Sequence, residues 1–403
     1  MAHIVAIGAG QAGSSLVAKL RNSGFDGKVT LIGAEPHPPY QRPPLSKKYL
    51  LGDMPLDRLY LRPEKFYREN DITLRLDQPI TKIDPNTRCI FLDNEVISYD
   101  ELALTTGSVP RLLPASIGGA LDGVHVVRSL SDVDAMAPRF DAKARILIVG
   151  GGYIGLEAAA VAATKGLEVT LVEMADRILQ RVAAPQTSDF FRNLHQLHGV
   201  DIREGVGLER LFGTDAVTGA ALTDGSELAV DFVIAGVGVT PATDLAEQAG
   251  LEIDNGIKTN VLGQSSDPHI WAAGDCASLP YRGRQIRLES VQNAIDQAEI
   301  VAKNMLGGNR PYHPMPWFWS DQYDVKLQIA GLNSGYDRVV TRPGEKDGAV
   351  SFWYYNKTSL LAVDAANDPR AYMIGKRLIE AEKSPAPQVI EDPKTDLKAL
   401  LKP

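Results

Sequence analysis

The chain has 403 residues, too many for one hydrophobic core of ordinary size, so we expect two or three domains. Apolar residues make up 44% and charged residues 23% of the sequence, as in a globular protein. The formal net charge of -8 argues against a general role in nucleic-acid binding. No apolar run is long enough to span a bilayer, so we expect no membrane segment.

The ends and cysteines of the chain predict its compartment. A strand begins almost at residue 1, which leaves no room for a signal peptide. The two cysteines, Cys89 and Cys276, form no CxxC pair. We therefore expect a cytoplasmic protein without structural disulfides and without a metal site. We expect Cys89 in a strand and Cys276 behind a turn, neither of them catalytic.

The first predicted unit covers residues 3–35, HIVAIGAGQAGSSLVAKLRNSGFDGKVTLIGAE, and consists of a strand, a turn, a helix and a second strand. Gly8, Gly10 and Gly13 give GxGxxG spacing. Gly8 allows a tight turn, Gly10 lets backbone amides approach a pyrophosphate, and Gly13 lets the helix pack on the strand. Glu35, after the second strand, can accept hydrogen bonds from ribose hydroxyls. The unit predicts a dinucleotide site.

The same unit recurs in RILIVGGGYIGLEAAAVAATKGLEVTLVEMADR (residues 145–177). Gly150, Gly152 and Gly155 follow a strand over residues 146–149, and Glu173 ends the next strand. Two nucleotides are therefore expected, one flavin and one nicotinamide cofactor, unless the repeat is kept only for packing.

The residue at the end of the second unit bears on the choice of nicotinamide cofactor. A carboxylate at Glu173 would bind a ribose 2′-hydroxyl and repel a 2′-phosphate. Met174 and Ala175 follow, where an NADPH site would favour arginine. We predict NADH, with Arg177 close enough to leave NADPH as the alternative.

The last 80 or so residues read as a third domain. Four segments of this part predict short strands: KLQIAGL, DRVVTRP, AVSFWYYN and SLLAVDAA. A hairpin turn is expected at YNKTS. RAYMIGKRLIEAEK predicts a closing helix, and the Pro- and Lys-rich tail is expected to be loose.

Three further segments resemble the marks of the two-dinucleotide-binding flavoproteins: YDELALTTGSVPR (99–111), FVIAGVGVTP (232–241) and DPHIWAAGDCA (267–277). The resemblance covers nearly the whole chain and implies an α/β fold with two Rossmann-like domains, one inserted in the other, plus an α+β C-terminal domain. FAD would occupy the first unit and NADH the second. The implied FAD-binding domain comprises residues 1–110 and 244–320, the NADH-binding domain 111–243, and the C-terminal domain 321–403.

The chain lacks the groups that thiol chemistry needs. Disulfide reductases of this superfamily carry a CxxxxC or CxxC pair and a histidine near the C-terminus that acts as a base. Similar oxidases and peroxidases carry one reactive cysteine. Here RPPLSK (42–47) stands near the expected cysteine position, and the last histidine is His313, which we expect in a loop. Dithiol chemistry is therefore not expected.

Four separated motifs together resemble the ferredoxin and rubredoxin reductases of oxygenase systems, above all putidaredoxin-reductase-like enzymes. The motifs are RPPLSK, GGGYIGLE (150–157), ESVQNA (289–294) and PWFWSDQY (316–323). The resemblance implies that Lys47 lies beside the flavin and pairs with Glu157, and both are our candidate catalytic residues. A cation near flavin N5 would help to hold the reduced, anionic ring. The alternative for Lys47 is a solvated loop lysine.

The motifs and the resemblance together give two sets of expected cofactor contacts. Those to FAD are Gly8, Gly10, Gln11, Ala12, Gly13, Glu35, Arg42, Lys47, Ile80, Thr105, Thr106, Gly107, Arg128, Asp275, Glu289, Val291 and Trp319. Those to NADH are Gly150, Gly152, Tyr153, Ile154, Gly155, Glu173, Gly236, Val237 and Gly238. For Trp319, core packing is an equal alternative.

The resemblance implies an FAD-dependent NADH:ferredoxin oxidoreductase. Hydride would pass from NADH to FAD, and single electrons would then pass to a [2Fe-2S] ferredoxin that serves a cytochrome P450 or another oxygenase. An acidic ferredoxin needs a local positive patch, for which the candidates are Arg282, Arg284, Arg287 and Arg310. A solvated hairpin is the equal alternative for this patch.

Three other functions stay open at this point. The first is an NADH:rubredoxin reductase, which would share every motif above. The second is an NADH oxidase that uses oxygen or a quinone. The third is a redox sensor resembling apoptosis-inducing-factor flavoproteins. We expect a monomer rather than a dimer, because no active site shared between subunits is needed.

Overall fold

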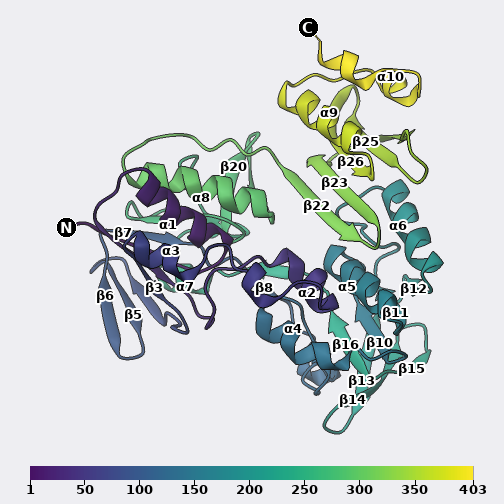
Figure 1. The fold of residues 1–403 in the computed structure, drawn as a ribbon, viewed down its shortest axis with the longest axis horizontal. Coiled ribbons are helices and arrows are strands. Elements are labelled where there is room, and N and C mark those ends of the chain that lie inside the picture. The colour runs from purple at the N-terminus through teal and green to yellow at the C-terminus, as the bar shows by residue number, and fades with distance from the viewer. Residues whose placement is uncertain (403) are drawn as a thin grey trace. The chain divides into compact units, whose positions relative to one another are not determined.

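The computed structural model describes residues 1–402, whose contacts divide the chain into two compact units (Figure 1). The first unit comprises residues 1–42, 55–109 and 239–316, and the second comprises residues 43–54, 110–238 and those from 317 onward. The short segment 43–54 thus belongs to the second unit although both of its chain neighbours belong to the first. The three-domain boundaries expected from the sequence stay a prediction.

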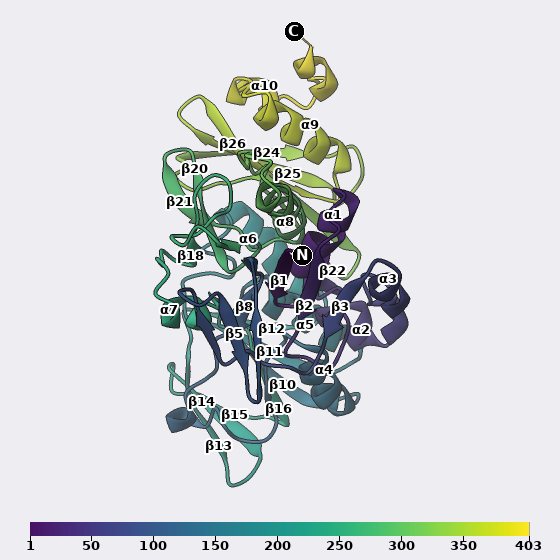
Figure 2. The same ribbon diagram turned by 90° about the vertical axis from the view of Figure 1, so that its left-hand side faces the viewer.

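The first unit is built on a parallel five-stranded sheet in the order β19-β7-β1-β2-β3. Its strands are β1 (His3–Ile7), β2 (Lys28–Ile32), β3 (Ile72–Arg75), β7 (Glu101–Leu104) and β19 (Ile270–Ala272). Helices α1 (Gln11–Asn22) and α8 (Val291–Met305) lie side by side, as Figures 1 and 2 both show. Their apolar faces share one core with the sheet, as the hydrophobic periodicity of a surface helix requires.

Smaller elements complete the first unit. One three-stranded sheet contains β4 (Lys82–Asp84), β5 (Cys89–Leu92) and β6 (Glu95–Ser98), and another contains β18 (Ile257–Lys258), β20 (Ala277–Tyr281) and β21 (Arg284–Arg287). The remaining helices are α3 (Glu64–Glu69) and α7 (Asp244–Gln248). Cys89 lies in a strand, as predicted, and residues 277–287 form a hairpin, with Arg282 at a φ of 48° in its turn.

The second unit repeats the parallel architecture with strand order β12-β11-β10-β16-β9. The strands are β9 (Val124–His125), β10 (Arg145–Val149), β11 (Glu168–Glu173), β12 (Asp201–Glu204) and β16 (Phe232–Ala235). Its helices are α2 (Lys48–Leu51), α4 (Leu130–Met136), α5 (Tyr153–Thr164) and α6 (Pro185–Leu197). An antiparallel sheet of β13 (Leu208–Gly213), β14 (Val217–Leu222) and β15 (Glu227–Ala229) packs into the same core.

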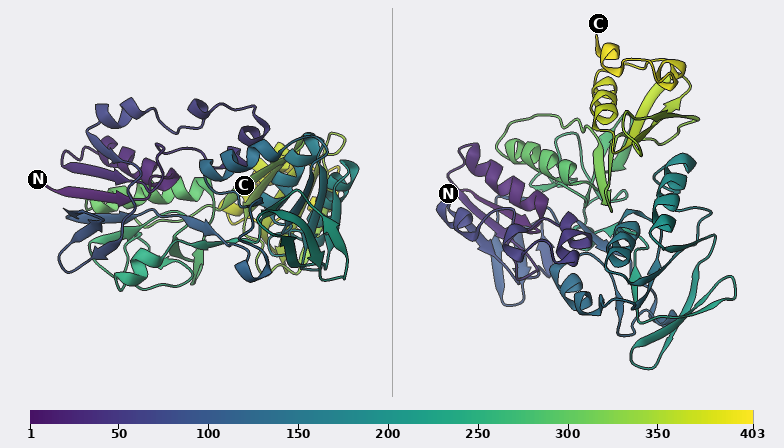
Figure 3. Two further views of the ribbon diagram at one scale, coloured as in Figure 1. Left: turned by 90° about the horizontal axis from the view of Figure 1, so that it is seen from below. Right: turned by 45° about the vertical axis from the view of Figure 1, so that its right-hand side comes forward.

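The C-terminal part of the second unit is an antiparallel sheet in the order β22-β23-β26-β25-β24. Its strands are β22 (Trp317–Gln322), β23 (Val325–Gly331), β24 (Arg338–Pro343), β25 (Val350–Asn356) and β26 (Ser359–Ala366). Helix α9 (Pro369–Glu380) lies against this sheet, as the yellow helix in Figure 3 shows. The four strands and the closing helix expected from the sequence are confirmed, and β22 is an additional strand.

The expectation of a loose tail is wrong. Residues 387–391 form helix α10 (Pro387–Glu391), and Ile390 and Leu397 are buried in the core that they share with α9. The Arg342 side chain, only 8% exposed as a residue, donates four hydrogen bonds to main-chain carbonyl oxygens of residues 390–395. The residue types of the tail do not indicate this anchoring, because the hydrogen-bond acceptors are main-chain carbonyl oxygens. None of the helices within residues 1–402 is long and apolar enough to cross a membrane.

Candidate functional site

The first glycine loop, between β1 and α1, has the geometry of a dinucleotide cradle. Gly8 has a φ of 112°, and its amide donates to the Ile32 carbonyl at 2.8 Å, which places the turn at the carboxyl edge of the sheet. A Cβ atom at Gly13 would lie 2.1 Å from the Gly8 carbonyl oxygen, so only glycine allows the helix to pack this closely. The loop therefore depends on both glycines.

Gly10 lies at the opening of the same loop. It caps α1, and a Cβ atom built on it would meet no atom within 4 Å. The first amides of α1 have no acceptor within the helix, as at any helix N-terminus. Open space beside free amides and a positive helix end is what a pyrophosphate requires. The first unit thus fits a dinucleotide.

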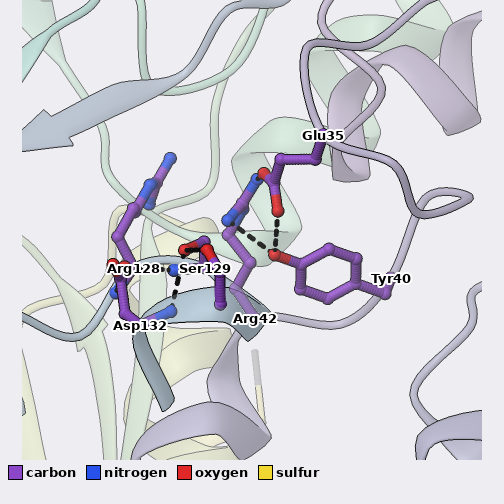
Figure 4. Close-up of polar contacts among 7 residues, drawn as sticks. Glu35, Tyr40, Arg42, Arg128, Ser129 and Asp132 are labelled. Atoms are coloured by element: carbon purple, nitrogen blue, oxygen red, sulfur yellow. Dashed lines mark hydrogen bonds and ion pairs between the residues drawn. The ribbon is translucent and has the colours of Figure 1, made fainter. Parts of the chain in front are cut away.

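Glu35 is at the position where a ribose-binding carboxylate is expected, and it already has two partners. Figure 4 shows the hydroxyl of Tyr40 and the guanidinium of Arg42 turned toward its carboxylate. The distances are 2.6 Å from Tyr40 Oη and 2.5 Å from Arg42. The structure therefore brings together Glu35 and Arg42, two expected FAD contacts, and adds Tyr40, which the motif did not reveal.

Asp275 and Glu289, two expected FAD contacts, belong to a second polar cluster. Ser108 donates to the Asp275 carboxylate at 3.2 Å, and Arg287 donates to its main-chain carbonyl at 3.3 Å. Arg287 also pairs with Glu289 at 2.5 Å, and its Nε is buried without a hydrogen-bond partner within residues 1–402. This orphaned donor marks a place that a ligand oxygen can complete.

The other expected FAD contacts in the first unit lie on the elements around the loop. Thr105 donates to the carbonyls of Ile7 and Gly8, and Thr106 donates to the carbonyl of Ala242. Gly107 continues this turn with a φ of 75°. Gln11 and Ala12 start α1, Val291 starts α8, and Ile80 packs against the apolar core.

Cys276 follows the Asp275 turn and is inert by its surroundings. It is fully buried, and its Sγ lies 3.4 Å from the Leu104 carbonyl oxygen. Burial raises the pKa of the Cys276 thiol, so little thiolate forms at neutral pH. The expectation that this residue packs behind the turn is confirmed.

The second glycine loop repeats the geometry of the first. Gly150 has a φ of 107°, and a Cβ atom at Gly155 would lie 2.1 Å from the Gly150 carbonyl oxygen. Gly152 caps α5, and a Cβ atom on it would meet no atom within 4 Å. Gly236 lies directly against this loop. A Cβ atom built on Gly150 would be only 2.5 Å from the Gly236 carbonyl oxygen. The second unit therefore also fits a dinucleotide.

The carboxylate of Glu173 lies beside this loop. It accepts hydrogen bonds from the main-chain amides of Gly151 at 2.7 Å and Ala175 at 2.8 Å. The guanidinium of Arg177 donates instead to Ser188 at 2.5 Å and to the Ala183 carbonyl at 2.8 Å. The one arginine that suggested NADPH is thus engaged with its own loop.

The remaining expected NADH contacts border the same loop. Val237 and Gly238 follow β16, and Ile154 is 41% exposed at the start of α5. The ring of Tyr153 packs against Phe318 of β22 with ring centroids 5.0 Å apart. The Tyr153 hydroxyl is buried without a hydrogen-bond partner within residues 1–402, and burial raises its pKa.

Lys47 and Glu157, the two candidate catalytic residues, form a close ion pair. Lys47 Nζ lies 2.6 Å from Glu157 Oε2, with side-chain exposures of 15% and 4%. Ser46 donates to the same oxygen at 2.7 Å, and Ser320 donates to Oε1 at 2.7 Å. Lys47 is therefore a held side chain and not a solvated loop lysine. Both serines stand inside the motifs noted in the sequence, although neither was assigned a role.

Two further expected FAD contacts belong to the second unit. Trp319 on β22 is partly exposed and has neighbouring rings on Trp317 and Phe318. The main-chain amides of Arg128 and Ser129 donate to the carboxylate of Asp132 in the first turn of α4, as drawn in Figure 4, and Ser129 is the N-cap of this helix. For both residues, contact with FAD stays a prediction.

The four arginines expected to form a docking patch are not equivalent. Arg282 and Arg284 are exposed in the β20–β21 hairpin, and Arg310 is exposed in a loop. Arg287 is different, because its side chain is only 10% exposed and is held by Glu289 and the Asp275 carbonyl. Docking of a ferredoxin on any of the four arginines stays a prediction, and Arg287 is the one of the four whose side chain is largely buried.

Comparisons with known proteins agree with this geometry. Residues 2–298 match the family described as pyridine nucleotide-disulphide oxidoreductase, and residues 317–401 match the reductase C-terminal family. A ferredoxin–NAD(P)+ reductase of Sphingomonas sp. is 41% identical, over 99% of this chain and 98% of its own length. A rubredoxin–NAD+ reductase of Pseudomonas putida is 34% identical, over 91% and 96%.

A solved structure gives the same result. The putidaredoxin reductase in a covalent complex with putidaredoxin is 38% identical, covers 99% of this chain and 98% of its own, and has a TM-score of 0.95. Enzymes of this family use FAD and NAD(P)H, which accords with two dinucleotide cradles. The chain belongs to the pyridine nucleotide-disulphide oxidoreductase family and, within it, to the putidaredoxin-reductase-like ferredoxin reductases.

Proposed function

We propose that this protein is an NADH:ferredoxin oxidoreductase that supplies single electrons to a [2Fe-2S] ferredoxin of an oxygenase system. The observation that carries the proposal is the pair of glycine cradles together with a Lys47–Glu157 ion pair in place of a redox cysteine. When bound, FAD accepts a hydride from NADH and releases electrons one at a time.

The residues of the first unit would bind the pyrophosphate and the hydroxyl groups of FAD. The amides that follow Gly10 would bind the pyrophosphate, and Glu35 and Asp275 would bind hydroxyl groups. Lys47 would lie beside the isoalloxazine, where its charge favours the reduced, anionic ring. Glu157 keeps that charge compensated, because a largely buried ammonium needs a partner.

The second unit would hold NADH in preference to NADPH. Glu173 is fixed by two main-chain amides, so its negative charge faces any 2′-substituent of the ribose. Arg177 is engaged with Ser188 and Ala183 and is not available to pair with a 2′-phosphate. No acid or base is needed for hydride transfer, which depends on close stacking.

Anaerobic stopped-flow reduction tests the function directly. The protein with bound FAD is reduced by one equivalent of NADH and then mixed with a [2Fe-2S] ferredoxin, a rubredoxin or aerated buffer. We expect rapid reoxidation by the ferredoxin and slow reoxidation by air, with NADPH a poorer reductant than NADH. Fast reoxidation by air alone, with both iron proteins inert, would contradict the proposal and favour an oxidase or a redox sensor.

The second candidate is an NADH:rubredoxin reductase, because a rubredoxin reductase covers nearly the whole chain at 34% identity. The same experiment separates the two functions. Reoxidation by rubredoxin at least about tenfold faster than by ferredoxin, a difference of about 1.4 kcal/mol in barrier, would assign the one-iron carrier.

We propose that the ferredoxin docks on the exposed arginines of the β20–β21 hairpin. Replacing both Arg282 and Arg284 with glutamate is expected to lower the second-order rate of ferredoxin reduction about tenfold at low salt. The dependence of that rate on ionic strength is expected to become shallower, while reduction by NADH stays unchanged. Rates are measured by stopped-flow at several salt concentrations.

Lys65→Glu combined with Arg68→Glu on α3 is the matched control, since it reverses two exposed positive charges at another site of the first unit. The control is expected to leave the rate and its salt dependence close to those of the parent protein. Equal effects of the control and of the hairpin variant would contradict docking at the hairpin.

A further inference from the structure

The Glu157 carboxylate is the end of a longer hydrogen-bonded chain that runs through β22 into α6. Ser320 and Gln322 are two residues apart on β22, so both point to the buried face of the strand, with exposures of 0% and 1%. Gln322 Nε2 lies 3.2 Å from Ser320 Oγ, and Gln322 Oε1 lies 2.8 Å from His195 Nε2. Tyr323 Oη lies 3.2 Å from His195 Nδ1.

The direction of every hydrogen bond in this chain follows from the carboxylate. An ionised carboxylate only accepts, so the single hydroxyl hydrogen of Ser320 goes to Glu157. Ser320 Oγ must then accept from the amide nitrogen of Gln322, which leaves the amide oxygen to accept from His195. His195 therefore carries a hydrogen on Nε2, and when the ring is neutral its bare Nδ1 accepts from Tyr323.

The surroundings of His195 agree with a neutral ring. The residue is fully buried, and burial lowers the pKa of His195 to about 4, although the hydrogen bond to Gln322 opposes this shift and His198 adds to it. His198 stacks on the Tyr323 ring, with centroids 3.7 Å apart, and so closes the far end of the chain.

We propose that Ser320, Gln322 and His195 are positioning residues that hold Glu157, and through it Lys47, in a fixed place and charge state. This inference rests on the proposed position of Lys47 beside the flavin. The chain joins the segment 43–54, α5, β22 and α6, so a shift in any one of them is resisted by the others. It transmits orientation and not protons, because a glutamine amide cannot take up a proton from one neighbour and release another.

The midpoint potential of the bound flavin, measured with reference dyes, tests the proposal. Lys47→Met sets the reference, and we expect it to lower the potential because a positive charge near the reduced ring is lost. Ser320→Ala is expected to lower the midpoint potential by a smaller amount. Gln322→Leu is expected to lower it less than Ser320→Ala does, and His195→Leu least of the three. Ser320→Thr and His195→Gln keep a donor at each position and are expected to restore the parent potential.

Gln322→Glu is a second test, because it reverses the polarity of one link. A glutamate cannot donate to Ser320, so two carboxylates compete for one hydroxyl hydrogen, and the shift is expected to exceed that of Gln322→Leu. Unchanged potentials in Ser320→Ala and Gln322→Glu would overturn the proposal, as would equal shifts in Ser320→Ala and Ser320→Thr.

A measurement on the unaltered protein does not depend on the folding of any variant. Nitrogen-15 spectra of labelled histidines are expected to show His195 as the neutral Nε2–H tautomer down to about pH 5. An Nδ1–H tautomer would overturn the proposal. Neither readout uses an iron–sulfur protein, so failure to reduce ferredoxin would reject the proposed function while the potentials and the tautomer still decide the role of the chain.

Discussion

An alanine at Gly10 is expected to weaken FAD binding without unfolding the protein, and an alanine at Gly152 is expected to weaken NADH binding while FAD stays bound. Both glycines have negative φ values, -102° and -80°, and a Cβ atom on either meets no protein atom within 4 Å. Alanine therefore fits the folded chain, at a cost of about 1 kcal/mol or less at a helix cap.

The effect on the cofactors is expected to be much larger. The new methyl group would enter the space that the pyrophosphate needs, and a loss of about 1.4 to 2.8 kcal/mol weakens binding tenfold to a hundredfold. For Gly10→Ala, flavin content after dialysis and the FAD dissociation constant are measured. For Gly152→Ala, KM for NADH is measured at unchanged flavin content.

Each variant is the control for the other, and the melting temperature of the apoprotein checks the fold. Gly155→Val is the contrasting case, because its side chain would collide with the Gly150 carbonyl and damage the fold itself. If Gly152→Ala lost its flavin and kept its KM for NADH, the assignment of the two cradles would be wrong.

Asp364→Asn is expected to stabilise the protein at pH 8 and to leave its stability at pH 4 nearly unchanged. Asp364 on β26 is fully buried, and its Oδ2 accepts hydrogen bonds from Tyr354 and, at 3.0 Å, from Thr187 of α6. Its Oδ1 has no hydrogen-bond partner within residues 1–402. Burial raises the pKa of Asp364 to about 7, although the bonds from Tyr354 and Thr187 oppose this shift.

The direction in which the folding stability changes with pH follows from proton uptake by Asp364. Between the ordinary pKa of 3.8 and about 7 the folded state holds a proton that the unfolded chain has lost, so stability falls as pH rises through this window. Full ionisation costs up to about 4 kcal/mol at 1.36 kcal/mol for each pKa unit. Asparagine does not titrate, so its variant escapes this cost.

Melting temperatures at pH 4 and pH 8 measure the difference. At pH 8 we expect the Asn variant to melt several degrees higher, because each kcal/mol shifts the melting point of a large domain by roughly 2–4 °C. Asp364→Leu is the control, since it removes the charge but leaves Tyr354 and Thr187 without their acceptor. Parallel pH curves for Asp364→Asn and the parent protein would contradict a buried, titrating carboxyl.

The local elements could be predicted from the sequence because short-range patterns determine them. β1 spans the predicted residues 3–7, and the strand that ends at Glu173 is found as β11. Glycine spacing predicted both cradles because the steric limits at Gly13 and Gly155 come from neighbours a few residues away. Residues 317–322 form a strand that the sequence analysis does not predict, since it considers Trp319 only as a flavin contact or as core packing.

The parts of the site that escaped prediction are those that depend on residues far apart in the chain. Ser320 reaches Glu157 across more than 150 positions, and His195 reaches Gln322 across more than 100. The sequence groups Arg287 with Arg282 and Arg284 in one positive patch because they are close together in the chain, whereas in the structure the Arg287 guanidinium donates to the Asp275 carbonyl. No periodicity carries such information.

The anchoring of the C-terminal segment by Arg342 has a consequence for sequence drift. The guanidinium recognises four main-chain oxygens between residues 390 and 395, and such oxygens are present whichever side chain each residue carries. Substitutions at Lys394 can therefore accumulate while the segment keeps its path. Arg342 itself has no such freedom, since a lysine cannot reproduce the fork that bridges these oxygens. One side chain can thus hold a stretch whose composition alone resembles disorder.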